Sequence, residues 1–331
     1  MGRVPDYNFL CGILRSREAG FVAPQRLEAV LAARGFDDAV AQLPDGPFAV
    51  EVRKSPGFEG LERGARAETA VLRDLLAKYS PSEGLEGLLL APLDWFNLKV
   101  AVLQKLTGRR DERLPGPEGS LRFADLAAMA EAGRTDGLPR SFADALGAAL
   151  GAYNEAGRST QAFELALDRQ RELALLSLAR STSEEIGAHA RESADLSASL
   201  VLSRAALAGI PWSVSRYGFA GHADEARFAD LAGMKPAEWT ARLAGIGSTG
   251  AREVLAAVAA GGNVAEIAAA RRKKLAARIR DWRFRPPSAE YAYWWISRKL
   301  ADLANLRLAL VCKLNGLPEA ETRKRIDDGL L

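Results

Sequence analysis

Three aspartates, Asp94, Asp195 and Asp302, recur about one hundred residues apart in the sequence, and carboxylates can bind metal ions or act as general acids and bases. No histidine or cysteine accompanies them, and the chain has only two of each. We therefore expect no metal site and no catalytic site at these positions. The pattern favours a role on a helix surface, such as pairing with Lys299 or accepting a hydrogen bond from a neighbouring backbone.

Gly245 to Gly250 match the G-x-G-x-x-G string of dinucleotide-binding sites. These glycines serve such a site only after a β-strand, where they let a pyrophosphate approach the N-terminus of a helix. Here the string follows residues 238–244, whose pattern predicts a helix. We expect a loop between two helices, and no bound nucleotide or other cofactor.

A basic segment, residues 271–285, carries eight cations and one acid, Asp281, with Trp282 and Phe284 between them. Such a segment could follow a phosphate backbone and stack bases. The formal net charge of the chain is only +3, however, so its composition does not indicate a nucleic-acid partner. We expect a solvated or partner-facing helix. The candidate partner contacts are Arg271, Arg272, Lys273 and Lys274.

The remaining reactive side chains have no companions that would suggest catalysis. His189 and His222 lack a nearby nucleophile motif, and Cys11 and Cys312 are too far apart in the sequence to suggest a disulfide framework, which fits a reducing compartment. Cys312 lies within a predicted helix, the usual place for a buried, inert thiol. The sequence contains no P-loop, no G-x-S-x-G string and no paired-carboxylate signature. This favours a structural or binding role without a small-molecule substrate.

Internal repeats identify the elements that carry these residues. Residues 122–129 (RFADLAAM) and 227–234 (RFADLAGM) agree at seven of eight positions. Each of the three aspartates also begins a segment that reaches a glycine fourteen residues later, and the copies begin 101 and 107 residues apart. The first and third copies share an Asn, a Leu, a cation and a Lys; the middle copy lacks the Asn, the Leu and the Lys. The signature residues are Asp94, Asn97, Leu98, Gly108, Asp195, Gly209, Asp302, Asn305, Leu306 and Gly316.

Each copy predicts the last four turns of a helix, about 21 Å long, with the glycine in a left-handed conformation just past its end. The third helix is expected to begin after Ser288 as N-cap and to run to Asn315. Loops are expected at residues 114–119 and 209–221, which are rich in turn formers. The expected apolar stripe of the third helix is Tyr293, Ile296, Leu300, Ala304, Leu308 and Val311.

The composition favours an all-α fold, because the helix formers Ala and Leu dominate and β-branched residues are scarce. A chain of 331 residues with 48% hydrophobic residues can form two or three domains. The repeat predicts three helical domains at residues 1–112, 118–211 and 220–320, with a C-terminal tail at 321–331. Neither a signal peptide nor an apolar run of about 18 residues is apparent, so a soluble, cytoplasmic protein is expected.

The closing-helix motif, D-x-x-N-L-[KR] followed by K-x-x-G, resembles the central-stalk C subunits of the prokaryotic V-type (A/V-type) ATPases and ATP synthases, the counterparts of the eukaryotic d subunits. Residues 290–318 are the most similar segment, and residues 94–109 come next. The N-terminal segment with Tyr7, Arg15 and Arg17 also resembles the first helix of that family. The chain departs from the family pattern in its middle copy and at Asp302, where the family often has Glu.

This resemblance implies a non-catalytic central-stalk (rotor) subunit, built as three pseudo-symmetric helical domains arranged as a funnel. The funnel would sit on the ring of membrane rotor subunits, at the inner, cytoplasmic face of the cell membrane, and receive the end of the central shaft during proton or sodium transport. Such a coupler needs stiff helices and large partner surfaces, and no active site. The transported ion and the direction of the reaction are determined in other subunits.

Three other classes of protein share some of these features. A helical-repeat scaffold would share the composition, but its repeats are typically 20–45 residues long, much shorter than the spacing of about one hundred residues found here. The other two alternatives are an RNA-binding helical protein that uses residues 271–285 and a helical enzyme without a known motif. Gene neighbourhood would separate them, since subunits of a rotary ATPase should be encoded together.

Overall fold

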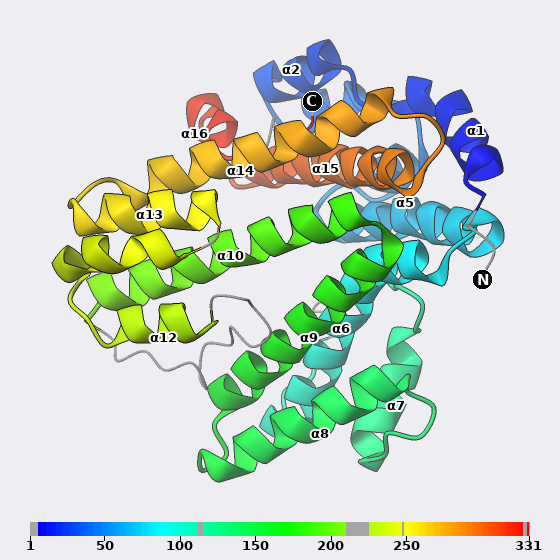
Figure 1. The fold of residues 1–331 in the computed structure, drawn as a ribbon. Helices are drawn as coiled ribbons and strands as arrows, with labels where there is room; N and C mark the ends of the chain where they lie inside the picture. Colours follow the sequence, from blue (N-terminus) through cyan, green and yellow to red (C-terminus); the bar gives the residue numbers. More distant parts are fainter. Residues whose placement is uncertain (1–5, 112–114, 210–224, 247, 327–329, 331) are drawn as a thin grey trace. The chain divides into compact units, whose positions relative to one another are not determined.

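The computed structural model describes residues 6–111, 115–209, 225–246, 248–326 and 330, and all of the regular elements in these ranges are helices (Figure 1). The expected all-α class is therefore confirmed. No helix of the described part combines the length and the apolar character needed to cross a bilayer. His222 and residues 210–221 of the second expected loop lie outside the described residues.

The chain divides into two compact units, which we describe separately. Unit 1 comprises residues 1–94, 115–122 and 276–331, and unit 2 comprises residues 95–114 and 123–275. Helices α6 (Glu83–Thr107) and α14 (Val264–Asp281) each contribute residues to both units.

Unit 1 contains helices from both the N-terminal and the C-terminal parts of the chain. Its long helices are α5 (Phe58–Tyr79) and α15 (Ala289–Leu314), which pack against each other. Their side chains form one core with the early helices, in which Leu303, Leu306 and Leu310 meet Val30 and Val52. The shorter elements are α1 (Asn8–Ser16), η1 (Glu18–Gly20), α2 (Pro24–Ala32), α3 (Phe36–Ala41), α4 (Pro47–Lys54), η3 (Trp282–Phe284) and α16 (Glu319–Arg323).

Unit 2 contains the middle of the chain, with the helices α7 (Phe123–Ala132), α8 (Arg140–Glu155), α9 (Thr160–Thr182), α10 (Glu184–Leu207), α12 (Glu225–Ala232), η2 (Pro236–Gly245) and α13 (Thr249–Ala259). Helices α8, α9 and α10 pack in sequence, and α10 also packs against α13. The core beside α10 surrounds Trp239, which is completely buried among Phe228, Leu202 and Leu255. Both RFADLA copies are thus helices, α7 and α12, as expected.

The three predicted closing helices are present as α6, α10 and α15, and they have 25, 24 and 26 residues. Their terminal glycines Gly108, Gly209 and Gly316 have φ angles of 66°, 65° and 65°. These are the left-handed angles that glycine adopts without steric cost, so the expected helix ends are confirmed. Ser288 is also confirmed as the N-cap of α15, because its side chain accepts a hydrogen bond from the Tyr291 amide.

The predicted apolar stripe of α15 is wrong for most of its members. Only Ile296 is buried, whereas Ala304 is exposed and Tyr293, Leu300, Leu308 and Val311 are half-buried. The face that is buried instead includes Arg298, Asp302 and Asn305 beside the apolar side chains. The predicted stripe missed the buried apolar residues Leu303, Leu306 and Leu310, which lie on the same face as these polar side chains.

The glycine string at residues 245–250 joins two helical elements, as expected. It leaves the 3₁₀ helix η2 and enters α13, whose N-cap Ser248 accepts a hydrogen bond from the Ala251 amide. The strand that precedes a dinucleotide fingerprint is replaced here by helix.

Candidate functional site

The closing helix α15 places a buried carboxylate, Asp302, against the loop that leads into α2. The side chain is 2% exposed, and its Oδ2 accepts a hydrogen bond from the Val22 amide at 2.9 Å. Its Oδ1 accepts one from Nε of Arg298, one turn earlier on α15, at 2.8 Å. Arg298 also donates to the Val22 carbonyl at 3.0 Å. The two side chains therefore satisfy both backbone groups of a residue that has no helical partner of its own.

Lys313 lies eleven residues further along α15 and binds the other end of α2. Its ammonium donates to the carbonyls of Leu31 and Ala33 at 2.7 and 2.5 Å. Eleven residues of helix span about 16 Å, and the nine residues of α2 span about 13 Å. The carboxylate thus lies before the positive end of the α2 dipole and the ammonium lies at its negative end, the favourable sense for both charges. We call this arrangement the α2 clasp.

The first copy of the motif makes the equivalent contacts. Asp94 of α6 accepts hydrogen bonds from the amides of Ser120 and Leu121, both at 2.9 Å, in the loop that leads into α7; these residues belong to unit 1. In unit 2, Lys105 of α6 donates to the carbonyls of Ala130 and Glu131 in the last turn of α7 at 2.6 and 2.7 Å. The shared Asp and Lys therefore have the same kinds of partner in both copies.

The middle copy keeps only part of this arrangement. Asp195 of α10 is buried, but the position of the lysine is occupied by Ala206. In α12, the carbonyl of Leu231 accepts a hydrogen bond from Nε1 of Trp239 at 2.9 Å. An indole thus supplies a donor to the last turn of α12, where the other two copies use an ammonium.

The other signature residues hold the closing helices against their neighbours. Asn97, Leu98, Asn305 and Leu306 are all buried. The cations that follow the leucines form ion pairs with other helices: Lys99 with Asp168 of α9 at 2.6 Å, and Arg307 with Glu62 of α5. The signature is therefore a set of packing and docking residues.

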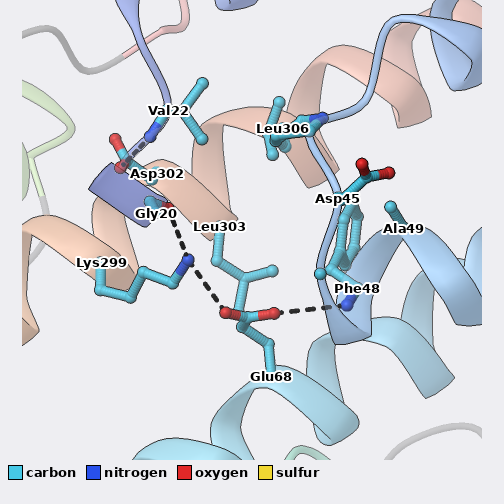
Figure 2. Close-up of a pocket in the computed structure, with 12 residues that line it drawn as sticks. Gly20, Val22, Asp45, Phe48, Ala49, Glu68, Lys299, Asp302, Leu303 and Leu306 are labelled. Atoms are coloured by element: carbon cyan, nitrogen blue, oxygen red, sulfur yellow. Dashed lines mark hydrogen bonds and ion pairs between the residues drawn. The ribbon is translucent and has the colours of Figure 1, made fainter. Parts of the chain in front are cut away.

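A second, partly buried ion pair ties α15 to α5 within unit 1 (Figure 2). Lys299 pairs with Glu68 at 3.0 Å and also donates to the Gly20 carbonyl at 3.0 Å. The other oxygen of Glu68 accepts a hydrogen bond from the Phe48 amide at the start of α4 at 3.3 Å. The cavity beside this pair is about 30 Å³, roughly the volume of one water molecule.

The structure corrects the expected role of the three aspartates. They are buried instead of lying on a helix surface, and Lys299 forms its ion pair with Glu68 instead of an aspartate. The expected bond to a neighbouring backbone is present for Asp94 and Asp302. Burial raises the pKa of both carboxyls, and the amide hydrogen bonds oppose that rise.

The sequence analysis did not identify Arg298 and Glu68 as residues of this site. Arg298 and Glu68 lie outside the repeated motif, so nothing in the repeat indicated them. Lys105 and Lys313 carried a usable signal, because each stands three residues before a closing glycine. Among the described residues, no group of three or more His, Cys, Asp or Glu side chains is arranged to hold a metal ion.

The four candidate partner contacts lie on α14. Arg271 forms an ion pair with Glu253 of α13, whereas Arg272, Lys273 and Lys274 are exposed. Trp282 is 3% exposed and packs edge-on against Tyr293, with the ring centroids 5.8 Å apart. Phe284 is 74% exposed. One of the two interleaved aromatic residues is therefore a core residue.

The charges of the clasp and of the Lys299–Glu68 pair hold α15 against other helices and loops of the chain, which is what a stiff, non-catalytic component requires. Comparison with known families agrees with this geometry: the profile of the ATP synthase (C/AC39) subunit family matches residues 10–325. A comparison with individual curated proteins found no match. The chain thus belongs to the ATP synthase (C/AC39) subunit family, whose members are non-catalytic stalk subunits of the V-type rotary ATPase.

Proposed function

We propose that this chain couples the central shaft of a V-type ATPase or ATP synthase to the membrane ring of rotor subunits during proton or sodium transport. It would act at the inner face of the cell membrane, with the shaft and the ring as its protein partners. The α2 clasp is the observation that supports this role. Torque passes through a non-covalent adaptor only as far as its helices keep their positions, and the clasp fixes both ends of a short helix against a 26-residue helix.

The three-domain organisation is part of the same proposal. Residues 1–112, 118–211 and 220–320 would form three similar helical domains around a funnel. The nearly equal lengths of α6, α10 and α15 support it, as do the matching contacts of Asp94 and Asp302 and of Lys105 and Lys313. An experimental structure of the assembled complex tests it directly, by superposing the three ranges.

The function is tested by reconstitution. The purified chain is expected to bind both the isolated shaft subunits and the detergent-solubilised ring. A complex assembled without it is expected to hydrolyse ATP without moving ions, and addition of the chain should restore transport. If the chain binds neither partner, or if its addition leaves transport unchanged, the proposed coupling is wrong.

A further inference from the structure

The cavity beside Lys299 lies where four parts of unit 1 meet (Figure 2). It is lined by residues of η1 and the loop after it, of α4 and the loop before it, of α5 and of α15. Its lining includes three charged side chains that are largely withdrawn from solvent, with Lys299 20% exposed, Glu68 10% and Asp302 2%. The volume of about 30 Å³ admits one water molecule and excludes larger ligands. The three charges therefore determine what the cavity can bind.

The ammonium of Lys299 has one donor more than it has partners. An ammonium carries three N–H groups. In the described part of the chain Lys299 has two partners, Oε1 of Glu68 and the carbonyl of Gly20, each 3.0 Å from Nζ. The third N–H is therefore available to a ligand in the cavity.

The two carboxylates have acceptor positions that the described residues do not use. Glu68 and Asp302 each accept one hydrogen bond on each oxygen, from Lys299 and an amide and from Arg298 and an amide. An ionised carboxylate can accept about four. Burial raises the pKa of Asp302 although both of its donors oppose that rise. A further donor at either carboxylate would therefore stabilise its charge.

We propose that this cavity binds one ordered water molecule, which accepts a hydrogen bond from Lys299 and donates one each to Glu68 and Asp302. Water is the smallest ligand that supplies an acceptor and two donors at once. An anion would meet two carboxylates. A metal cation would be repelled by the ammonium, and no group of three or more metal-ligating side chains occurs in the part of the chain that the structure describes.

This water would join two clusters of charge that have no direct contact in the described structure. Asp302 belongs to the α2 clasp, whereas Lys299 and Glu68 tie α15 to α5. A shared water would make them one network across α15, α5 and the loop before α2, and such buried waters are costly to remove. The site would form in the isolated chain, so it does not depend on the shaft or the ring.

The first test displaces the water with a methyl group. Gly46 lines the cavity, and a Cβ there would lie 3.6 Å from Oε2 of Glu68, an ordinary contact. The matched control is Gly35→Ala, because both glycines are N-caps with extended backbones and a Cβ at Gly35 meets nothing within 4 Å. Gly46→Ala should leave the three charged groups without their shared partner and unfold about 3 °C below the control.

The opposite sign would overturn the proposal. Filling an empty cavity adds contacts without breaking hydrogen bonds, so an unoccupied site predicts that Gly46→Ala unfolds at the same temperature as Gly35→Ala or above it. Thermal unfolding of the full-length variants, followed by circular dichroism, measures the difference.

The second test locates the occupant directly. A crystal structure of the full-length chain should show one ordered peak within about 2.7–3.2 Å of Nζ of Lys299 and of a carboxylate oxygen of both Glu68 and Asp302. The peak should be missing from crystals of Gly46→Ala. A wild-type cavity without a peak, or a peak that does not contact the ammonium, would contradict the proposal.

A bound sodium ion would give a different result from water. Thermal unfolding of the wild type in sodium chloride and in choline chloride at equal ionic strength compares the two, because both salts screen charges equally. With water in the cavity, the unfolding temperatures should agree. A rise that is specific to sodium and that Gly46→Ala lacks would assign the cavity to a cation and overturn the proposal.

Discussion

At the scale of single residues, buried charges in this protein are satisfied mainly by backbone groups. Asp94 is held by the amides of Ser120 and Leu121, and Asp302 by an amide and Arg298. Hydrogen bonds to an ionised carboxylate are stronger than neutral ones, which offsets part of the cost of its burial. For Asp94, burial still raises the pKa of the carboxyl above its ordinary value, although the hydrogen bonds from the backbone amides oppose that rise.

This raised pKa predicts a pH dependence of stability. A carboxyl whose pKa is higher in the folded protein than in the unfolded chain stabilises the fold below the unfolded pKa, and that contribution is lost as the pH rises through the folded pKa. Asp94→Asn removes this titration. We therefore expect the variant's deficit in the free energy of unfolding to be largest in acid and to shrink as the pH rises. Denaturant titrations of both proteins over a pH series measure the deficit, and a deficit that grows with pH would show that the amide bonds outweigh burial.

Gly119 is required by its contact with Asp94. A Cβ at this position would lie 2.5 Å from Oδ1 of Asp94 and 2.6 Å from the Leu90 carbonyl oxygen. We expect Gly119→Ala to destabilise the protein by about 2 kcal/mol or more, since the loop must move away from the carboxylate. The control is Gly147→Ala within α8, where a Cβ meets nothing within 4 Å and should stabilise by roughly 0.5–1 kcal/mol. Thermal unfolding of both variants checks this, and equal shifts would contradict the contact.

At the scale of elements, the clasp explains how short helices persist. A nine-residue helix is marginal in water, because few of its hydrogen bonds offset the cost of nucleation. Helix α2 is stabilised by the core beneath it and by charges of the favourable sign at both ends. Helix α7 has the same ammonium contact from Lys105, and α12 has an indole in its place.

Loss of the ammonium should loosen the end of α2. We expect Lys313→Met to lower the free energy of unfolding by about 2 kcal/mol, since two carbonyls lose a charged donor. Lys324→Met is the matched control, because among the described residues that ammonium pairs with Glu321 alone, at an exposed position where an ion pair contributes little. Chemical denaturation compares the two variants. A similar decrease in the free energy of unfolding of both variants would show that Lys313 contributes no more than an exposed charge.

At the scale of the whole molecule, residues near the two ends of the chain are interdependent. The bond between Val22 and Asp302 joins positions 280 residues apart, and the bonds of Lys313 to Leu31 and Ala33 are of similar range. The N-terminal helices of unit 1 therefore complete their core only when α15 is in place.

Hydrogen exchange can test this dependence. Asp302→Ala leaves the buried Arg298 without its carboxylate, a loss of about 3–5 kcal/mol for pairs of this kind. Exchange should accelerate in α2 and α15, which belong to unit 1, while α10 and α13 of unit 2 keep their protection. Equal acceleration everywhere would show that the two units open as one cooperative unit.

Local features of this protein could be predicted from its sequence. The closing glycines, the serine N-cap of α15 and the helices at both RFADLA copies were predicted correctly, because capping and left-handed φ angles depend on neighbouring residues only. The family also followed from the repeated motif. The sequence showed that Lys313 stands three residues before Gly316, but it did not show that Lys313 binds the carbonyls of Leu31 and Ala33.

Short-range pattern in the sequence was therefore enough to specify the helical class, the ends of the closing helices and the family. Long-range packing, in contrast, set which face of α15 is buried, bound Asp302 to Val22 just before α2 and Lys313 to the last turn of α2, and paired Arg271 with Glu253. These contacts join residues on different elements, up to 282 positions apart. Their geometry depends on how whole helices pack. Residue type alone does not distinguish a buried Asp from an exposed one.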